Sequence, residues 1–122
     1  MTRFGMAAGL ILALVIAGCD GADPACATLP TRIELNLTAD RLSPANPAVC
    51  RDRGVTLVVT SEVDGVIHIH GYDDQVPATT VTAGEVTELD FTAARSGQFP
   101  IEVHTDENTQ GADVGIFMVH EP

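Results

Sequence analysis

The sequence contains no lysine, and its cationic side chains are six arginines. Against them stand 17 Asp and Glu residues, so the formal net charge is −11 at pH 7. Binding to nucleic acid or to anionic lipid headgroups requires a cluster of cationic side chains. The composition therefore excludes both classes and favours attraction of cations. The simpler interpretation of the same charge is an acidic surface that only keeps an exported protein in solution.

The chain also lacks an apolar run long enough to span a bilayer, which takes about 20 residues. Its apolar segment, residues 6–17, has twelve residues, follows Arg3 and leads into Gly18 and Cys19. A positive charge, a short apolar run and small residues in this order are typical of a secretory signal. The sequence therefore predicts that residues 1–18 are removed on export.

Residues 16–19, Ile-Ala-Gly-Cys, resemble the lipobox of bacterial lipoproteins, whose cysteine sulfur receives a diacylglyceryl group. The resemblance implies that Cys19 becomes the lipid-bearing first residue. Several acyl chains on one residue give lasting attachment, since each buried methylene contributes about 0.8 kcal/mol. We therefore expect a membrane-anchored protein facing the periplasm or the cell exterior. An ordinary signal with a chance cysteine at its end is the alternative.

Without its signal the chain would keep 104 residues, enough for one domain with a single hydrophobic core. Its charge would be −12, from five arginines against 17 acidic residues. Residues 19–30 contain Gly21, Pro24 and Pro30 and predict a short linker. The domain is therefore expected over residues 31–122.

If Cys19 carries lipid, Cys26 and Cys50 are the remaining cysteines. An even remainder in an oxidising compartment predicts a disulfide between them. A zinc site is the weaker alternative, because neither cysteine has another Cys or His two to four residues away.

Apolar and polar residues alternate in residues 31–38, which indicates a half-buried strand. Pro44 and Pro47 then interrupt the chain. Further strands are predicted over residues 55–60, 66–70, 76–81, 86–91, 99–105 and 114–120. Turns rich in Gly, Pro and Asp separate them at intervals of about ten residues, which is typical of a β-sandwich or barrel.

Residues 63–73, VDGVIHIHGYD, resemble the histidine-bearing strand end of the cupredoxin fold. Residues 81–91, 94–103 and 115–119 are similar to the closing strands of that family. The resemblance covers about residues 31–121 and implies an all-β fold, a Greek-key β-sandwich. An immunoglobulin-like sandwich is the alternative for strands of this composition.

Blue-copper cupredoxins hold their metal with an early His and with Cys, His and Met from the loop before the last strand. Aligning residues 97–99 on the family's Gly-x-aromatic strand places these three ligands near Val103, Asp106 and Asp113. None of the three ligand types is retained. The sequence therefore argues against a blue-copper electron carrier.

A different metal site is suggested by the histidines. His68 and His70 are two residues apart on a predicted strand, so their imidazoles share a face. His104 lies close to where the family's metal loop begins. These three, with Asp73 or Asp106, would form a site without thiolate, suited to Cu(II), Zn(II) or Ni(II), with Cu(II) bound most tightly.

Met118 and His120 form a second spaced pair, and a mixture of His and Met suits copper in either oxidation state. The alternative is that all four histidines are ordinary polar positions or hydrogen-bonded structural residues.

The sequence has no nucleophile motif and no glycine-rich phosphate loop, so we expect no enzymatic activity. We predict a membrane-anchored binding module that captures a transition metal, with copper as the first candidate. The alternative is a metal-free interaction domain that docks a protein of the cell envelope or adds a strand at an exposed sheet edge.

Overall fold

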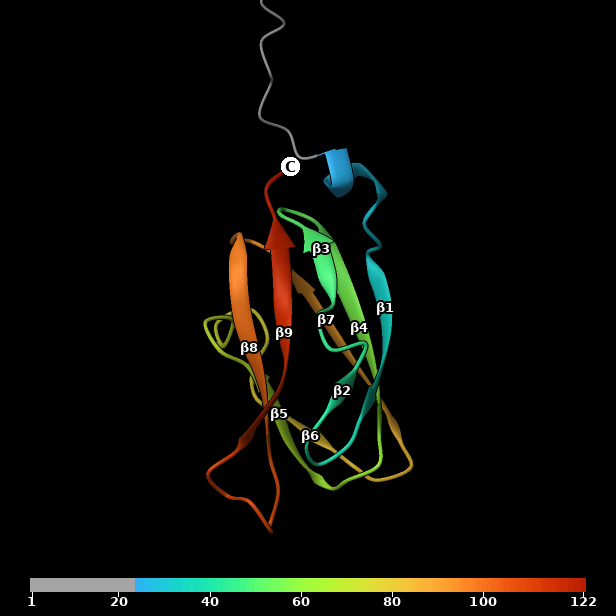
Figure 1. Cartoon of the computed structure of the whole chain (residues 1–122), viewed down its shortest axis with the longest axis vertical. Coiled ribbons are helices and arrows are strands. Elements are labelled where there is room, and N and C mark those ends of the chain that lie inside the picture. The colour runs from blue at the N-terminus through green and yellow to red at the C-terminus, as the bar shows by residue number, and fades with distance from the viewer. Residues whose placement is uncertain (1–23) are drawn as a thin grey trace, which may run out of the picture.

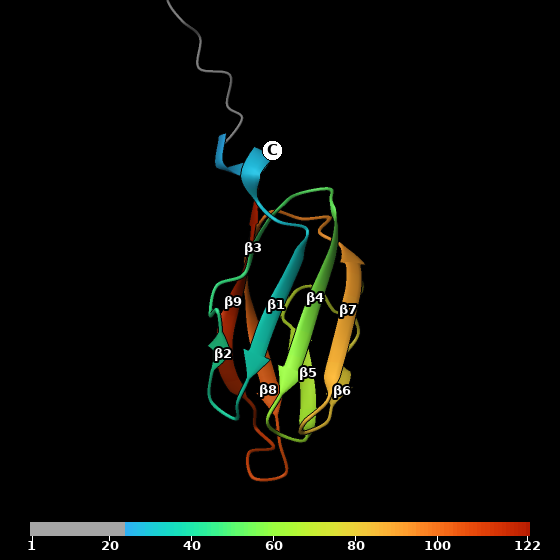
Figure 2. The ribbon, with the colours of Figure 1, turned by 90° about the vertical axis from the view of Figure 1, so that its right-hand side faces the viewer.

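Alternating apolar residues give the chain two β-sheets that pack face to face (Figures 1 and 2). The structure is a computed structural model and describes residues 24–122, so the expected signal peptide and Cys19 lie outside the described residues. The elements are η1 Pro24–Thr28, β1 Arg32–Leu37, β2 Leu42–Ser43, β3 Ala48–Cys50, β4 Gly54–Ser61, β5 Gly65–Ile69, β6 Thr79–Val81, β7 Val86–Thr92, β8 Gly97–His104 and β9 Ala112–His120. Within residues 24–122, no helix is long and apolar enough to cross a membrane.

The strand order is β2-β1-β4-β7 in one sheet and β3-β9-β8-β5-β6 in the other. After β4 the chain crosses to the second sheet, returns for β7 and crosses again for β8, which is a Greek-key path. The core fills the space between the sheets, and its members alternate with outward residues along the longer strands, except at the bulge of β9, where Val114 and Phe117 are three residues apart. The predicted all-β sandwich is therefore confirmed.

Two short edge strands, β2 and β3, occupy the segment in which the sequence predicted only a proline break. Pro44 and Pro47 lie between them, and each strand has a sheet neighbour on one side only. Proline is tolerated beside such edge strands because the missing N–H is not needed for pairing. Neither strand was among those predicted from the sequence.

The strand predicted over residues 76–81 was too long. Only Thr79–Val81 forms β6, because Val76 lies in a turn where its N–H donates to the Tyr72 carbonyl at 2.8 Å. The Val76 side chain still enters the core, which explains its apolar character.

A disulfide joins Cys26 to Cys50, with a Cα–Cα distance of 5.2 Å, as the sequence predicted. Cys26 lies in η1, within the segment expected to be a linker, and is buried against the end of the sandwich. The chain is therefore fixed to the domain from η1 onward.

Tyr72, fully buried, fixes the segment that follows β5. Its ring meets Phe91, Phe99 and Phe117 edge-on at centroid distances of 4.6 to 5.8 Å. Its hydroxyl donates to the Arg95 carbonyl and accepts the Arg95 N–H. Because this segment begins directly after β5, the aromatic cluster also holds the end of that strand in place.

Candidate metal site

The candidate site lies on the outer face of the five-stranded sheet, where β5 and β8 run side by side. These strands pair antiparallel, with His68 opposite Glu102 and Val66 opposite His104. Their alternate residues are buried on the inner face, namely Ile67, Ile69, Ile101 and Val103. A period of two therefore directs His68, Glu102 and His104 outward together.

His70 comes just after β5 and continues the same alternation. Its backbone N–H donates to the Pro100 carbonyl at 2.9 Å, so the pairing with β8 extends to this residue. We call His68, His70, Glu102 and His104 the outer cluster.

Three side-chain atoms of the outer cluster lie close enough to share one ion. Nε2 of His68 is 3.2 Å from Nε2 of His104 and 3.4 Å from Oε1 of Glu102. Nε2 of His104 is 2.5 Å from the same Glu102 oxygen. Each of these atoms is therefore within 3.4 Å of the other two.

His70 approaches the other side of the carboxylate. Its Nε2 is 2.6 Å from Oε2 of Glu102, and ligand atoms of His68, His70 and Glu102 all lie within 4.8 Å of one another. Glu102 therefore uses Oε1 for His68 and His104 and Oε2 for His70.

Two imidazoles of the outer cluster also have partners on the side away from its centre. Nδ1 of His104 is 3.0 Å from the Thr109 carbonyl oxygen, and Nδ1 of His68 is 3.4 Å from Oδ1 of Asp73. Metal-bound histidines commonly donate their outer N–H to a carbonyl or carboxylate in this way, which leaves the inner nitrogen for the ion.

Both ring nitrogens of His104 face oxygens that can only accept: the Thr109 carbonyl is 3.0 Å from Nδ1, and Oε1 of Glu102 is 2.5 Å from Nε2. A neutral imidazole has one N–H and can donate to only one of these two oxygens. An ion bound at Nε2 would leave Nδ1 to donate to the Thr109 carbonyl.

The hydrogen bond between His70 and Glu102 favours the charged form of both side chains. The hydrogen bond from His70 lowers the pKa of Glu102, against the opposing effect of burial. The same hydrogen bond raises the pKa of His70. Glu102 and His68 are each only 16% exposed, whereas His104 is 34% and His70 48% exposed, so the cluster is open to solvent on the His70 side.

The donor set and its spacing fit a divalent transition metal. Zinc lies about 2.0 to 2.2 Å from imidazole nitrogen and carboxylate oxygen, which places neighbouring ligand atoms roughly 3 Å apart. The spacings of 2.5 to 3.4 Å around Nε2 of His104 and His68 bracket that value. Imidazole suits Zn, Cu, Fe and Ni.

Of the candidate ligands, the structure brings His68, His70 and His104 together and leaves Met118 and His120 apart. On β9, Asp113 pairs with Glu102, whereas Met118 pairs with Gln98 near the other end of β8. At about 3.3 Å per residue, His120 is roughly 20 Å from the outer cluster. These two residues share its sheet face but not its position.

The two candidate aspartates also differ in position. Asp73 lies on the outer side of His68, whereas Asp106 lines a pocket beside His104. Of the other positions aligned with blue-copper ligands, Val103 is buried in the core and Asp113 is exposed on β9.

Glu102 is the site residue that the sequence interpretation missed. The pattern Glu-x-His at residues 102–104 repeats the period of two seen in His68 and His70, and both patterns lie on strands. That shared period was the available signal, because it places Glu102 on the same face as His104.

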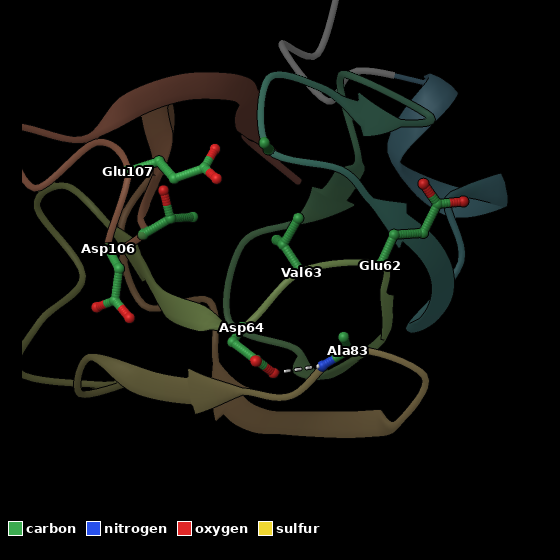
Figure 3. Close-up of a pocket in the computed structure, with 8 residues that line it drawn as sticks. Glu62, Val63, Asp64, Ala83, Asp106 and Glu107 are labelled. Atoms are coloured by element: carbon green, nitrogen blue, oxygen red, sulfur yellow. Dashed lines mark hydrogen bonds between the residues drawn. The ribbon is translucent and has the colours of Figure 1, made fainter.

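A pocket of about 290 Å³ is lined by residues of the turns that follow β1, β4, β6 and β8 (Figure 3). These turns lie at the end of the sandwich opposite η1 (Figure 1). Glu62, Asp64, Asp106 and Glu107 are among its lining residues, and Asp64 accepts the Ala83 N–H at 2.9 Å. The outer cluster is not part of its lining. The outer cluster therefore lies beside this pocket, on the sheet face.

No protein-family model and no curated protein matches the sequence. Solved structures resemble the fold. Reduced auracyanin from the photosynthetic bacterium Roseiflexus castenholzii superposes with a TM-score of 0.60 at 16% identity, over 75% of this chain and 98% of that one.

Two larger proteins contain a similar domain. Blue copper oxidase from Nitrosomonas europaea gives a TM-score of 0.57 at 16% identity, over 74% of this chain and 38% of that one. A chain of a heme-copper terminal oxidase dimer gives 0.58 at 17% identity, over 74% and 65%. These likenesses show that the fold is a cupredoxin-like β-sandwich.

Proposed function

We propose that this chain is a cupredoxin-like module that binds one divalent transition-metal ion at the outer cluster. One observation carries the proposal: Nε2 of His68, Nε2 of His104 and Oε1 of Glu102 lie within 3.4 Å of one another. His70, on the second Glu102 oxygen, completes a set of three imidazoles and one carboxylate.

The donors favour Cu(II), then Zn(II) or Ni(II), because affinity for nitrogen and oxygen ligands generally peaks at Cu(II). Within residues 24–122, no cysteine or methionine sulfur belongs to the outer cluster, so the cluster does not fit a blue-copper centre. Cys26 and Cys50 are joined in a disulfide near η1, and Met118 lies towards the far end of β8. The proposal is therefore capture or buffering of an ion rather than electron transfer or catalysis.

We also propose that Cys19 anchors this module to a membrane, on the strength of the lipobox-like residues 16–19. The described chain is fixed by the disulfide at Cys26, a few residues after Cys19. An anchor there would hold the domain by its η1 end, and the outer cluster lies towards the opposite end (Figure 1). In cell fractionation, the Cys19→Ser variant should leave the membrane fraction, whereas continued membrane retention would contradict the anchor.

Metal titration tests the binding proposal. Purified protein without residues 1–18, treated with a chelator, is titrated with Cu(II) and Zn(II) by calorimetry. We expect submicromolar binding at one ion per chain, and loss of that binding in a His68→Ala, His70→Ala double variant. Circular dichroism checks that the variant is folded. Absence of binding to the parent protein would leave the outer cluster as a hydrogen-bonded structural feature of a metal-free module.

A further inference from the structure

The loop between β8 and β9, residues 105–111, supplies the outer partner of His104. The Thr109 carbonyl accepts from His104 Nδ1 at 3.0 Å. Backbone hydrogen bonds hold the loop in shape. The Thr105 N–H donates to the Asn108 carbonyl at 3.2 Å, and the Asn108 N–H donates to the Thr105 carbonyl at 3.1 Å. The Gly111 N–H also donates to the Asn108 carbonyl, at 3.2 Å. The carbonyl that contacts His104 therefore belongs to a closed, internally bonded turn.

Gly111 brings the end of this loop directly against the outer cluster. Its φ is +90°, a conformation that residues with a side chain rarely adopt. A Cβ placed there would clash with Oε1 of Glu102 and lie 2.7 Å from Cε1 of His104. Glycine is therefore the residue that lets the backbone lie beside both side chains.

We propose that the 105–111 loop is a positioning element for the outer cluster, in which the Thr109 carbonyl keeps the proton of His104 on Nδ1 and directs Nε2 at the ion. Gly111 provides the space in which His104 and Glu102 take their positions. The consequence for affinity rests on the proposed metal binding, whereas the protonation of Nδ1 does not. Partners of this kind typically change metal affinity by about 10- to 100-fold.

Nuclear magnetic resonance of the metal-free, ¹⁵N-labelled protein tests the first part. Nδ1 of His104 should carry a proton that exchanges slowly with solvent, and the neutral imidazole should keep its one proton on Nδ1 even though Oε1 of Glu102 could accept from Nε2. An unprotonated Nδ1 would overturn the proposal. This measurement decides the matter whether or not a metal binds.

Addition of Zn(II) separates the two proposals. We expect the ¹⁵N shift of His104 Nε2 to change while the Nδ1 proton remains. Coordination through Nδ1 would overturn the positioning role and leave metal binding intact. No response to zinc, with the Nδ1 proton present, would refute metal binding and support the orientation of His104.

A matched pair of glycine variants tests the role of the loop. Gly111 and Gly84 both have positive φ, +90° and +81°, but a Cβ at Gly84 meets nothing within 4 Å. Gly84→Ala therefore reproduces the backbone strain without the clash. We expect Gly111→Ala to weaken Zn(II) binding about 10- to 100-fold and to expose the His104 Nδ1 proton, while Gly84→Ala changes neither. Equal zinc affinity and equal Nδ1 protection in the two variants would overturn the proposal, and if Gly111→Ala does not fold, the Nδ1 proton of the parent protein decides it.

Discussion

Nε2 of His104 lies 2.5 Å from Oε1 of Glu102, and both residues belong to the same strand, β8. Two residues apart on one strand, they project from the same face, which places a carboxylate beside an imidazole. The neighbouring strand adds His68, and His70 takes the second carboxylate oxygen. Glu102 is thus the side chain that all three histidines contact.

The first prediction concerns this carboxylate. Glu102→Gln keeps the shape of the side chain but removes its charge, so a divalent cation loses the anionic ligand of the site. We expect Cu(II) and Zn(II) affinity to fall by at least about 10-fold, since loss of even an outer partner costs that much. Competition with a chromophoric chelator measures the change. Glu34→Gln, at an exposed position of β1 in the other sheet, is the control, and equal weakening by both variants would contradict the assignment.

The sequence predicted the fold well in segments where apolar and polar residues alternate. In residues 31–38, Ile33, Leu35 and Leu37 occupy every second position, and β1 formed there. The short strands β2 and β3 were not predictable in this way. Each is two or three residues long, too short to show a period, and each is defined by its pairing with β1 or β9.

The site was predictable in part for a related reason. A period of two tells which face a residue occupies, so the pair His68 and His70 could be identified from sequence. It does not give the register between strands that are far apart in sequence. The position of Glu102 opposite His68 depends on that register, and so does the distance from His120.

The second prediction concerns pH and the metal-free protein. The raised pKa of His70 means that its contribution to stability is complete below its ordinary value of 6.5 and is lost as pH rises through the folded value. The lowered pKa of Glu102 means that its contribution is complete above 4.5 and is lost as pH falls through the folded value. Both contributions to stability are therefore present between pH 4.5 and pH 6.5.

Thermal unfolding with a chelator present checks this window. The difference in Tm between the parent protein and Glu102→Gln should be largest at about pH 5.5 and smaller at about pH 3 and pH 8. The same comparison with Glu34→Gln should show no such maximum. A difference that grows steadily towards pH 8 would show that the pair with His70 does not account for the effect of Glu102.

The third prediction separates the outer cluster from the other histidine. His120 pairs with Cys50 near the opposite end of the sheet, so it cannot reach an ion held by His68 and His104. His120→Ala should therefore keep the Cu(II) and Zn(II) affinity of the parent, and so should Met118→Ala. His104→Ala should weaken both. Electron paramagnetic resonance of the Cu(II) protein adds an independent check. The nitrogen hyperfine structure should change in His104→Ala and should match the parent in His120→Ala and Met118→Ala.

The fourth prediction concerns the disulfide, which closes a segment with a sequence separation of 24. A cross-link over that span limits the unfolded chain, and its loss costs about 3 kcal/mol in the chain-entropy account. Cys26→Ala, Cys50→Ala protein should lose about this much free energy of unfolding in urea, with a steeper urea slope because the unfolded chain is no longer cross-linked. Its metal affinity should not change, because the disulfide lies near η1 and the outer cluster lies towards the other end of β8 (Figure 1). A large loss of metal affinity in the folded double variant would mean that the two ends of the sandwich are coupled.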